Sequence, residues 1–121
     1  MFKLDLSSTY AYPVKFTVID EAGNQKTHQI KALFKRLSRE ALIELQNHDA
    51  QEGKKTADEI LDADVEYLRR FMDGWQDVEI NGSQAFDDDQ LRALLNSVPQ
   101  ISTAIADAFF ESAAGGQKRK N

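Results

Sequence analysis

Few residues of this chain could do chemistry, because its 121 residues include two His and no Cys. Without Cys there is no thiol nucleophile, no disulfide framework and no thiolate ligand for a metal. A metal or nucleophilic site would need His28 or His48, or would have to be built from carboxylates alone. His48 is followed directly by Asp49, so this pair is the first candidate for a metal site.

A His-Asp pair resembles the ligands of the HD-type metal phosphohydrolases, with His28 upstream and Asp73 or Asp107 as the remaining ligands. That family takes its ligands from helices, whereas the pattern around His28 predicts a strand. The favoured interpretation of His48 is an exposed helix C-terminus, where a His interacts well with the helix dipole. The hydrolase is kept as the less favoured alternative.

Three other motifs could suggest a cation site, a phosphate-binding loop or a serine nucleophile, but each lacks a feature that such a site requires. Asp87–Asp89 lacks the ligand spacing over roughly twelve residues and the distal Glu of an EF-hand. Gly115-Gly116 has no strand before it, as a phosphate-binding loop requires. Ser97, Ser102 and Ser112 lie in no nucleophile elbow. We therefore expect no enzyme activity, no cofactor and no metal.

Composition narrows the class of protein. The 15 Lys and Arg against 20 Asp and Glu give a net charge of −5, with 41% hydrophobic residues. This length fits one domain that can bury a core without disulfides. No stretch approaches the ~20 apolar residues that span a bilayer, so we expect a cytoplasmic protein without a membrane partner. The acidic total argues against nucleic-acid binding, despite the basic residues 118–120.

The charge is segregated along the chain. Residues 1–39 carry seven basic and three acidic side chains, a net +4. Residues 40–90 carry four and 15, a net −11, and residues 91–121 carry four and two, a net +2. The acidic middle is interpreted either as solvated helix faces or as a surface for electrostatic assembly.

Alternation of apolar and polar residues predicts a β-hairpin near the start. The segments 12–20 and 28–35 alternate around a turn at Gly23-Asn24, and residues 2–7 could add a third strand. The basic side chains expected on the outward face or edge are Lys15, Lys26, Lys31 and Lys35.

Helical signals follow. Ser38 is a good N-cap for a helix over about 39–48, and Thr56–Glu59 is a capping box for a second helix. The second helix is expected to continue to Gly74, because its apolar residues recur at spacings of 4, 3, 4 and 3. These anchors, expected in the core, are Leu61, Val65, Leu68, Met72 and Trp75.

An extended stretch and a turn at Asn81-Gly82 are expected after Trp75. Asp87 should cap a third helix that stops near Ser97, and a fourth should run from Pro99 to Gly115-Gly116. The predicted fold is α+β, a small N-terminal antiparallel hairpin or meander followed by a bundle of about four α-helices. Residues 1–116 are expected to form a single domain and 117–121 a disordered basic tail.

Three aromatic side chains outside the main stripe are candidates for binding a partner. Tyr67 and Phe71 stand four residues apart, and Phe109 and Phe110 point about 100° apart on a helix, so one can enter the core while the other stays near the surface. The candidate partner-binding residues, expected to be exposed apolar contacts, are Tyr67, Phe71 and Phe110. Packing against the hairpin is the alternative.

The order of these features over residues 12–116 resembles the tail assembly chaperones of long-tailed bacteriophages. The matching segments are the hairpin ending in His28–Ser38, the helix closing in Phe71–Trp75, the turn with Val78 and Asn81-Gly82, Phe86 with the acidic cap before Leu91–Leu95, and the last helix over Ile101–Ser112. The Gly-Trp, the Asn-Gly turn and the aromatic-capped helix are the most distinctive. The chain departs from the family pattern at Glu79-Ile80, where an Asp usually precedes the turn.

The resemblance implies a non-enzymatic protein of the host bacterial cytoplasm. Such chaperones bind the tape-measure protein, keep it soluble, help tail-tube subunits polymerise around it and are absent from the virion. Members often occur in a short form, which this chain would be, and a longer form made by ribosomal frameshifting, which would reach the major tail protein. Residues 117–121 would suit the junction. The alternative is a small phage structural protein such as a head–tail connector adaptor.

The resemblance also implies self-association, in some members as open spirals. We hypothesise that the basic hairpin of one subunit meets the acidic middle helices of the next. Such a head-to-tail contact would build a ring or a spiral.

Overall fold

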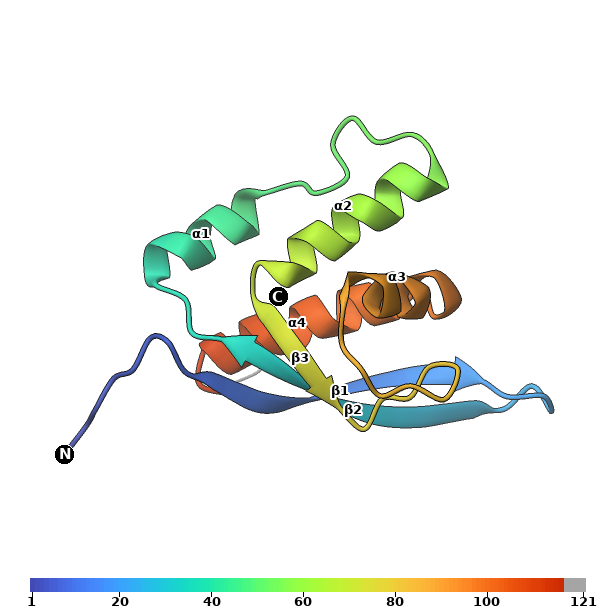
Figure 1. Ribbon diagram of the computed structural model, residues 1–121, viewed down its shortest axis with the longest axis horizontal. Helices are drawn as coiled ribbons and strands as arrows, with labels where there is room; N and C mark the ends of the chain where they lie inside the picture. The colour runs from blue at the N-terminus through green and yellow to red at the C-terminus, as the bar shows by residue number, and fades with distance from the viewer. Residues whose placement is uncertain (117–121) are drawn as a thin grey trace.

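The fold has two layers, a three-stranded antiparallel sheet and four helices on one of its faces (Figure 1). The computed structural model describes residues 1–116. The strands, in their order across the sheet, are β1 (Thr9–Ile19), β2 (Gln25–Lys35) and β3 (Met72–Gln76). The helices are α1 (Arg39–Asn47), α2 (Ala57–Arg69), α3 (Asp88–Ser97) and α4 (Ile101–Ala113). The predicted α+β class is confirmed, and the predicted tail over 117–121 lies outside the described residues.

The predicted hairpin is confirmed and is longer than expected. β1 and β2 pair in one unbroken register, in which Val14 lies opposite Ile30. These two residues face the helices and are buried, whereas Lys15 and Lys31 are exposed on the outer face. Because successive strand residues alternate between the faces of a sheet, one side of the hairpin is apolar and the other remains open to water.

The prediction of a strand over residues 2–7 is wrong, because this segment makes no strand pairing. The chain turns before β1 instead: Asp5 Oδ1 accepts hydrogen bonds from the Ser7 amide at 2.9 Å and from the Ser7 hydroxyl at 2.6 Å. The third strand of the sheet is β3, which joins β2 from a segment that the spacing of apolar residues placed on a helix.

The predicted continuation of the second helix to Gly74 is also wrong. α2 ends at Arg69, and the chain enters the sheet when the amide of Lys35 donates to the carbonyl of Phe71 at 2.8 Å. Met72 and Trp75, predicted as helical anchors, therefore lie on β3. Both are buried, so their assignment to the core is confirmed although their secondary structure differs.

A β-bulge explains how two residues three apart in β3 reach the same side. In a regular strand such residues face opposite sides of the sheet. Phe34 pairs with Met72, while the preceding residue of β2 pairs with Gly74. Asp73 is therefore an extra residue in β3, and it turns Met72 and Trp75 toward the same face.

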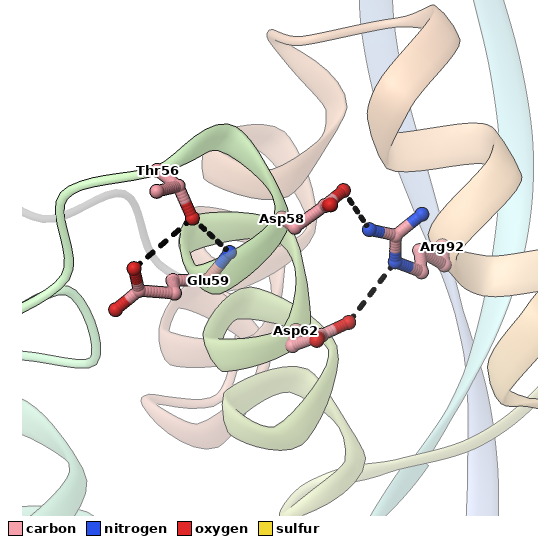
Figure 2. A network of polar contacts seen from close by, with 5 residues as sticks. All are labelled: Thr56, Asp58, Glu59, Asp62 and Arg92. Carbon is pink, nitrogen blue, oxygen red and sulfur yellow. Dashed lines mark hydrogen bonds and ion pairs between the residues drawn. The ribbon is translucent and has the colours of Figure 1, made fainter.

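Side-chain caps fix the starts of three helices as predicted. Ser38 Oγ accepts the amide three residues on at 3.2 Å, and Asp87 Oδ1 accepts that of Gln90 at 2.8 Å. Thr56 Oγ1 accepts the amide of Glu59 at 3.1 Å and donates to its carboxylate at 3.1 Å (Figure 2). The Glu59 carboxylate thus bonds the Thr56 hydroxyl instead of the backbone amide expected of a capping box.

Two turns that the sequence places with glycine are confirmed. Asn81 and Gly82 both have positive φ, +51° and +82°, and the flanking residues exchange two backbone hydrogen bonds. Helix α4 ends at Ala113, and Gly115 and Gly116 follow it with φ of +81° and +86°.

The free edge of β1 is closed to an added strand. Gln100, just before α4, donates from its side-chain amide to the Thr17 carbonyl at 2.7 Å, so Thr17 points its backbone groups away from β2. Pro13, four residues earlier in β1, has the same orientation and carries no amide hydrogen. A further strand would therefore find no amide donor at Pro13 and would find the Thr17 carbonyl already bonded to Gln100.

Three Phe rings hold the two layers together. Phe71, just after α2, stacks on Phe109 of α4 with ring centroids 4.3 Å apart. Phe34 of β2 lies edge-on to Phe109 at 5.3 Å and tilted against Phe71 at 6.2 Å. All three are essentially unexposed, so they join the sheet, α2 and α4 at one point of the core.

Replacement of Phe71 tests whether the three Phe rings hold the two layers together. We expect Phe71→Ala to lower the free energy of unfolding by about 3–5 kcal/mol, because it leaves a cavity between both neighbouring rings. Phe71→Leu should cost less because it keeps more of the volume. Urea denaturation measures both, with Ile43→Ala as the control at an exposed apolar position of α1. Equal losses for Phe71→Ala and Ile43→Ala would contradict the assignment.

Candidate partner-binding surface

The residues considered for metal chemistry do not form a site in the described part of the chain. His28 of β2 stacks on Phe16 at 5.7 Å, and His48 after α1 stacks on Tyr67 at 5.9 Å. Within residues 1–116 there is no group of three or more His, Cys, Asp or Glu side chains that could hold a metal ion. The ligand set considered for an HD-type hydrolase is therefore not assembled there.

No helix within residues 1–116 has both the length and the apolar character to cross a membrane.

The three aromatic residues predicted to bind a partner lie together. The rings of Tyr67 and Phe71 are 5.6 Å apart, and those of Phe71 and Phe110 are 6.4 Å apart. The expectation that Phe71 is exposed is wrong, because its ring lies against Phe34 and Phe109 and is 0% exposed. Tyr67 and Phe110 are half-buried and stay predicted contact residues.

Tyr67 also connects α1 to α2. Its hydroxyl donates to the Leu45 carbonyl at 3.3 Å, and the His48 ring stacks almost parallel on it. Burial raises the pKa of the Tyr67 hydroxyl, and the nearby charge of Arg70 partly opposes this. A pocket of about 260 Å³ adjoins the ring, lined by charged residues that include Glu66 and Arg70. One side of the Tyr67 ring thus packs toward the core, and charged residues of the pocket surround its other side.

A larger groove of about 580 Å³ lies at the C-terminal end of α4. Its apolar lining comes from the segment before β1, from β1, from the start of α1 and from α4. Its larger apolar residues are Leu4, Leu6, Tyr10, Tyr12, Leu37, Leu42 and Phe109, and Ala113 lies among them. Sequence reasoning missed this groove, because the alternation over residues 2–7 was interpreted as a strand.

Two tyrosines anchor the floor of this groove to α4. The Tyr12 hydroxyl donates to Glu111 Oε2 at 2.9 Å, and the Tyr10 hydroxyl lies 2.7 Å from Ser112 Oγ. The hydrogen bond to Glu111, with a smaller contribution from burial, raises the pKa of Tyr12. The groove therefore has a fixed floor, made by hydrogen bonds between residues about a hundred positions apart.

The acidic charge of α2 is partly used within the fold. Arg92 of α3 donates to Asp58 at 2.7 Å and to Asp62 at 3.0 Å (Figure 2). Hydrogen bonds to Asp58 and Asp62 raise the pKa of Arg92. In a further ion pair the cation comes from α2 and the carboxylate from α3, since Arg69 at the end of α2 pairs with Asp88. Two helices that would otherwise repel are thereby joined side by side.

Other acidic side chains stay available to a partner. Glu40 and Glu44 of α1 and Glu66 of α2 are exposed and make no ion pair within residues 1–116. Some carboxylates of the acidic middle therefore hold α3, a role that neither interpretation of the sequence included, and others remain solvated. The role of the acidic middle in assembly stays a prediction.

The Arg92 contacts lead to a salt-dependent prediction. Arg92→Gln should lower the urea midpoint of unfolding at low ionic strength, because Asp58 and Asp62 would face each other without a cation. The difference from the parent should narrow in high salt, where exposed charges are screened. Arg70→Gln is the matched control, since Arg70 makes no ion pair within the described residues. A difference independent of salt would contradict the electrostatic account.

The sequence matches the model of a known protein family. No curated protein and no solved structure matches the chain. A family model described as phage tail assembly chaperone matches residues 1–121. The hairpin, the Asn-Gly turn, α3 with its Asp87 cap and the last helix α4, which carried part of the resemblance, are present in the structure. The segment 71–75, which the resemblance treated as the close of a helix, lies largely in β3. Because the model covers the whole chain, this protein belongs to the phage tail assembly chaperone family.

Proposed function

We propose that this protein binds the tape-measure protein of its phage, keeps it soluble and assists tail-tube subunits in polymerising around it. Its membership of the chaperone family over the whole chain carries the proposal. In this proposal it acts without catalysis in the host cytoplasm and leaves before the virion is complete. The half-buried aromatic residues Tyr67 and Phe110, next to the exposed Glu66, supply an apolar contact with an acidic rim.

The remaining parts of the proposal concern domain organisation and a longer form. We propose that residues 1–116 act as one chaperone domain, because one hydrophobic cluster includes residues from Val14 to Phe109. A frameshifted form would keep this domain and add a segment that reaches the major tail protein. Since α4 has ended before Gly115, an extension there would leave the packed helices unchanged.

Co-expression tests the chaperone proposal. We expect this protein to raise the soluble yield of a fragment of the tape-measure protein from the same phage, and to form a complex with it on gel filtration. Tyr67→Ala with Phe110→Ser should lower that yield several-fold, because the two substitutions remove the apolar contact. Ile19→Ser is the matched control, an exposed apolar residue at the hairpin tip.

Circular dichroism and urea unfolding should show that the double variant is folded before its yield is compared. An unchanged soluble fraction and no complex with the parent protein would contradict the proposal. Detection of the protein in purified virions by mass spectrometry would also contradict it, because a chaperone of this kind leaves the particle.

We also propose that copies of the chain associate head to tail through charge. The outer face of the hairpin exposes Lys15 and Lys31, and α1 and α2 expose carboxylates such as Glu44 and Glu66. These patches lie on different sides of the molecule, so their contact repeats from copy to copy instead of closing a symmetric dimer.

Light scattering over a salt series tests the electrostatic contact. The average mass should fall as salt rises, because screening shortens the reach of exposed charges to about 3 Å at 1 M. Lys15→Gln with Lys31→Gln should reproduce the effect at low salt. Lys26→Gln serves as a control, because the strand register places Lys26 on the same face as Ile30 and not on the outer face that the sequence predicted. A mass that is unchanged from low to high salt would contradict the electrostatic contact.

A further inference from the structure

The segment before β1 presents apolar side chains to water. Six large apolar residues are exposed within residues 1–116, and four of them belong to residues 1–6. Phe2 is 86% exposed, Leu4 64% and Leu6 59%. Residues 1–6, called the arm below, run away from the helices and the sheet (Figure 1). A cluster of exposed apolar side chains of this kind marks an interaction site.

The root of the arm is fixed to the body by hydrogen bonds. Besides the two bonds from Ser7, the backbone carbonyl of Asp5 accepts from the Ser8 hydroxyl at 2.8 Å. Arg36, just after β2, donates to that same Ser8 hydroxyl at 2.9 Å, while its guanidinium lies over the Tyr10 ring. The bonds from Ser7 lower the pKa of Asp5. The direction of the arm is therefore set by a turn that is tied to β2.

The arm does not fill the groove beside it. Leu4 and Leu6 form part of the wall of the 580 Å³ groove, yet more than half of each remains exposed. Phe2 lies beyond the groove and lines none of it. The volume lies within the range of about 300–1,000 Å³ that ligand pockets occupy. The molecule thus carries an apolar groove that its own arm lines without filling, and the end of the arm at Phe2 stays uncovered.

We propose that the arm of one copy docks into the groove of a second copy, with Phe2 as the anchor. From Leu6 to Phe2 an extended chain spans about 13 Å, which is enough to reach a neighbouring subunit. Because the arm leaves from the wall of its own groove, reciprocal exchange of arms closes a symmetric dimer, whereas docking of each arm onto a further copy builds a ring or an open helix. The contact rests on the proposed self-association and assigns it a second, apolar interface.

This contact differs from the hairpin–helix contact in its response to salt. Burial of apolar side chains does not weaken when charges are screened, and some salts strengthen it. At roughly 1 M salt the charged contact is reduced and the arm contact should be the one that remains. The two interfaces can therefore be separated in one protein by changing ionic strength alone.

Variants of the arm and the groove test the inference in high salt. We expect the parent to associate there in a concentration-dependent way, and Phe2→Ser with Leu4→Ser to run as a monomer. Ala113→Arg should have the same effect from the groove side, because Ala113 is an exposed lining residue at the end of α4. A basic residue at a helix C-terminus is compatible with folding. Ile19→Ser, at a position that is also exposed but absent from the groove lining, should associate like the parent.

Cross-linking gives a direct readout, since the chain has no Cys of its own. Lys3→Cys protein mixed with Ala113→Cys protein should form a disulfide-linked heterodimer much faster than the same Lys3→Cys protein mixed with Ile19→Cys. Lys3 is chosen because Phe2 is then left intact. Equal rates for the two mixtures would overturn the inference.

Three other outcomes would overturn it. One is a parent that is monomeric in high salt, and another is an arm variant that associates as strongly as the parent. The third is Ala113→Arg losing the soluble yield of the tape-measure fragment while association stays intact, because the groove would then belong to the client. The chaperone proposal is tested separately, because it depends on the soluble yield of the tape-measure fragment that is co-expressed with the parent protein.

Discussion

The structure depends on the burial of Phe71 between Phe34 and Phe109. This ring stands where helix α2 gives way to strand β3, and its backbone carbonyl accepts a hydrogen bond from the Lys35 amide. Phe71 lies just beyond the C-cap of α2, starts the pairing with β2 and packs the helices onto the sheet. Its ring neighbours come from β2 and α4, and one of them, Phe109, also lines the groove.

The surface left by this packing is divided by chemical character. The outer face of the hairpin is basic, α1 and α2 expose carboxylates, and the groove beside the arm is apolar. Arg92 shows that part of the acidic charge stabilises the fold, since it joins α2 to α3. A member of a chaperone family with such a surface has separate places for a client and for further copies of itself. Closure of the β1 edge by Pro13 and Gln100 favours side-chain contacts over strand addition as the means of association.

Much of the fold could be predicted where the signal is local. Caps at Ser38, Thr56 and Asp87 and the turn at Asn81-Gly82 depend on residues at most three apart, and all were found as expected. The aromatic candidates were found together, but the exposure of Phe71 was predicted wrongly. The arm and its groove were missed because period-2 alternation over residues 2–7 is also what a strand would show.

The sequence by itself determined the hairpin, the helix starts, the α+β class and the resemblance to tail assembly chaperones, since each depends on short-range patterns. Only the tertiary structure decided that α2 stops at Arg69 and that Met72 and Trp75 belong to a strand. Spacings of three and four fit one face of a helix, and a strand with a bulge at Asp73 satisfies the same burial. The choice between them is made by hydrogen bonds to β2, about forty residues earlier, which no local pattern contains.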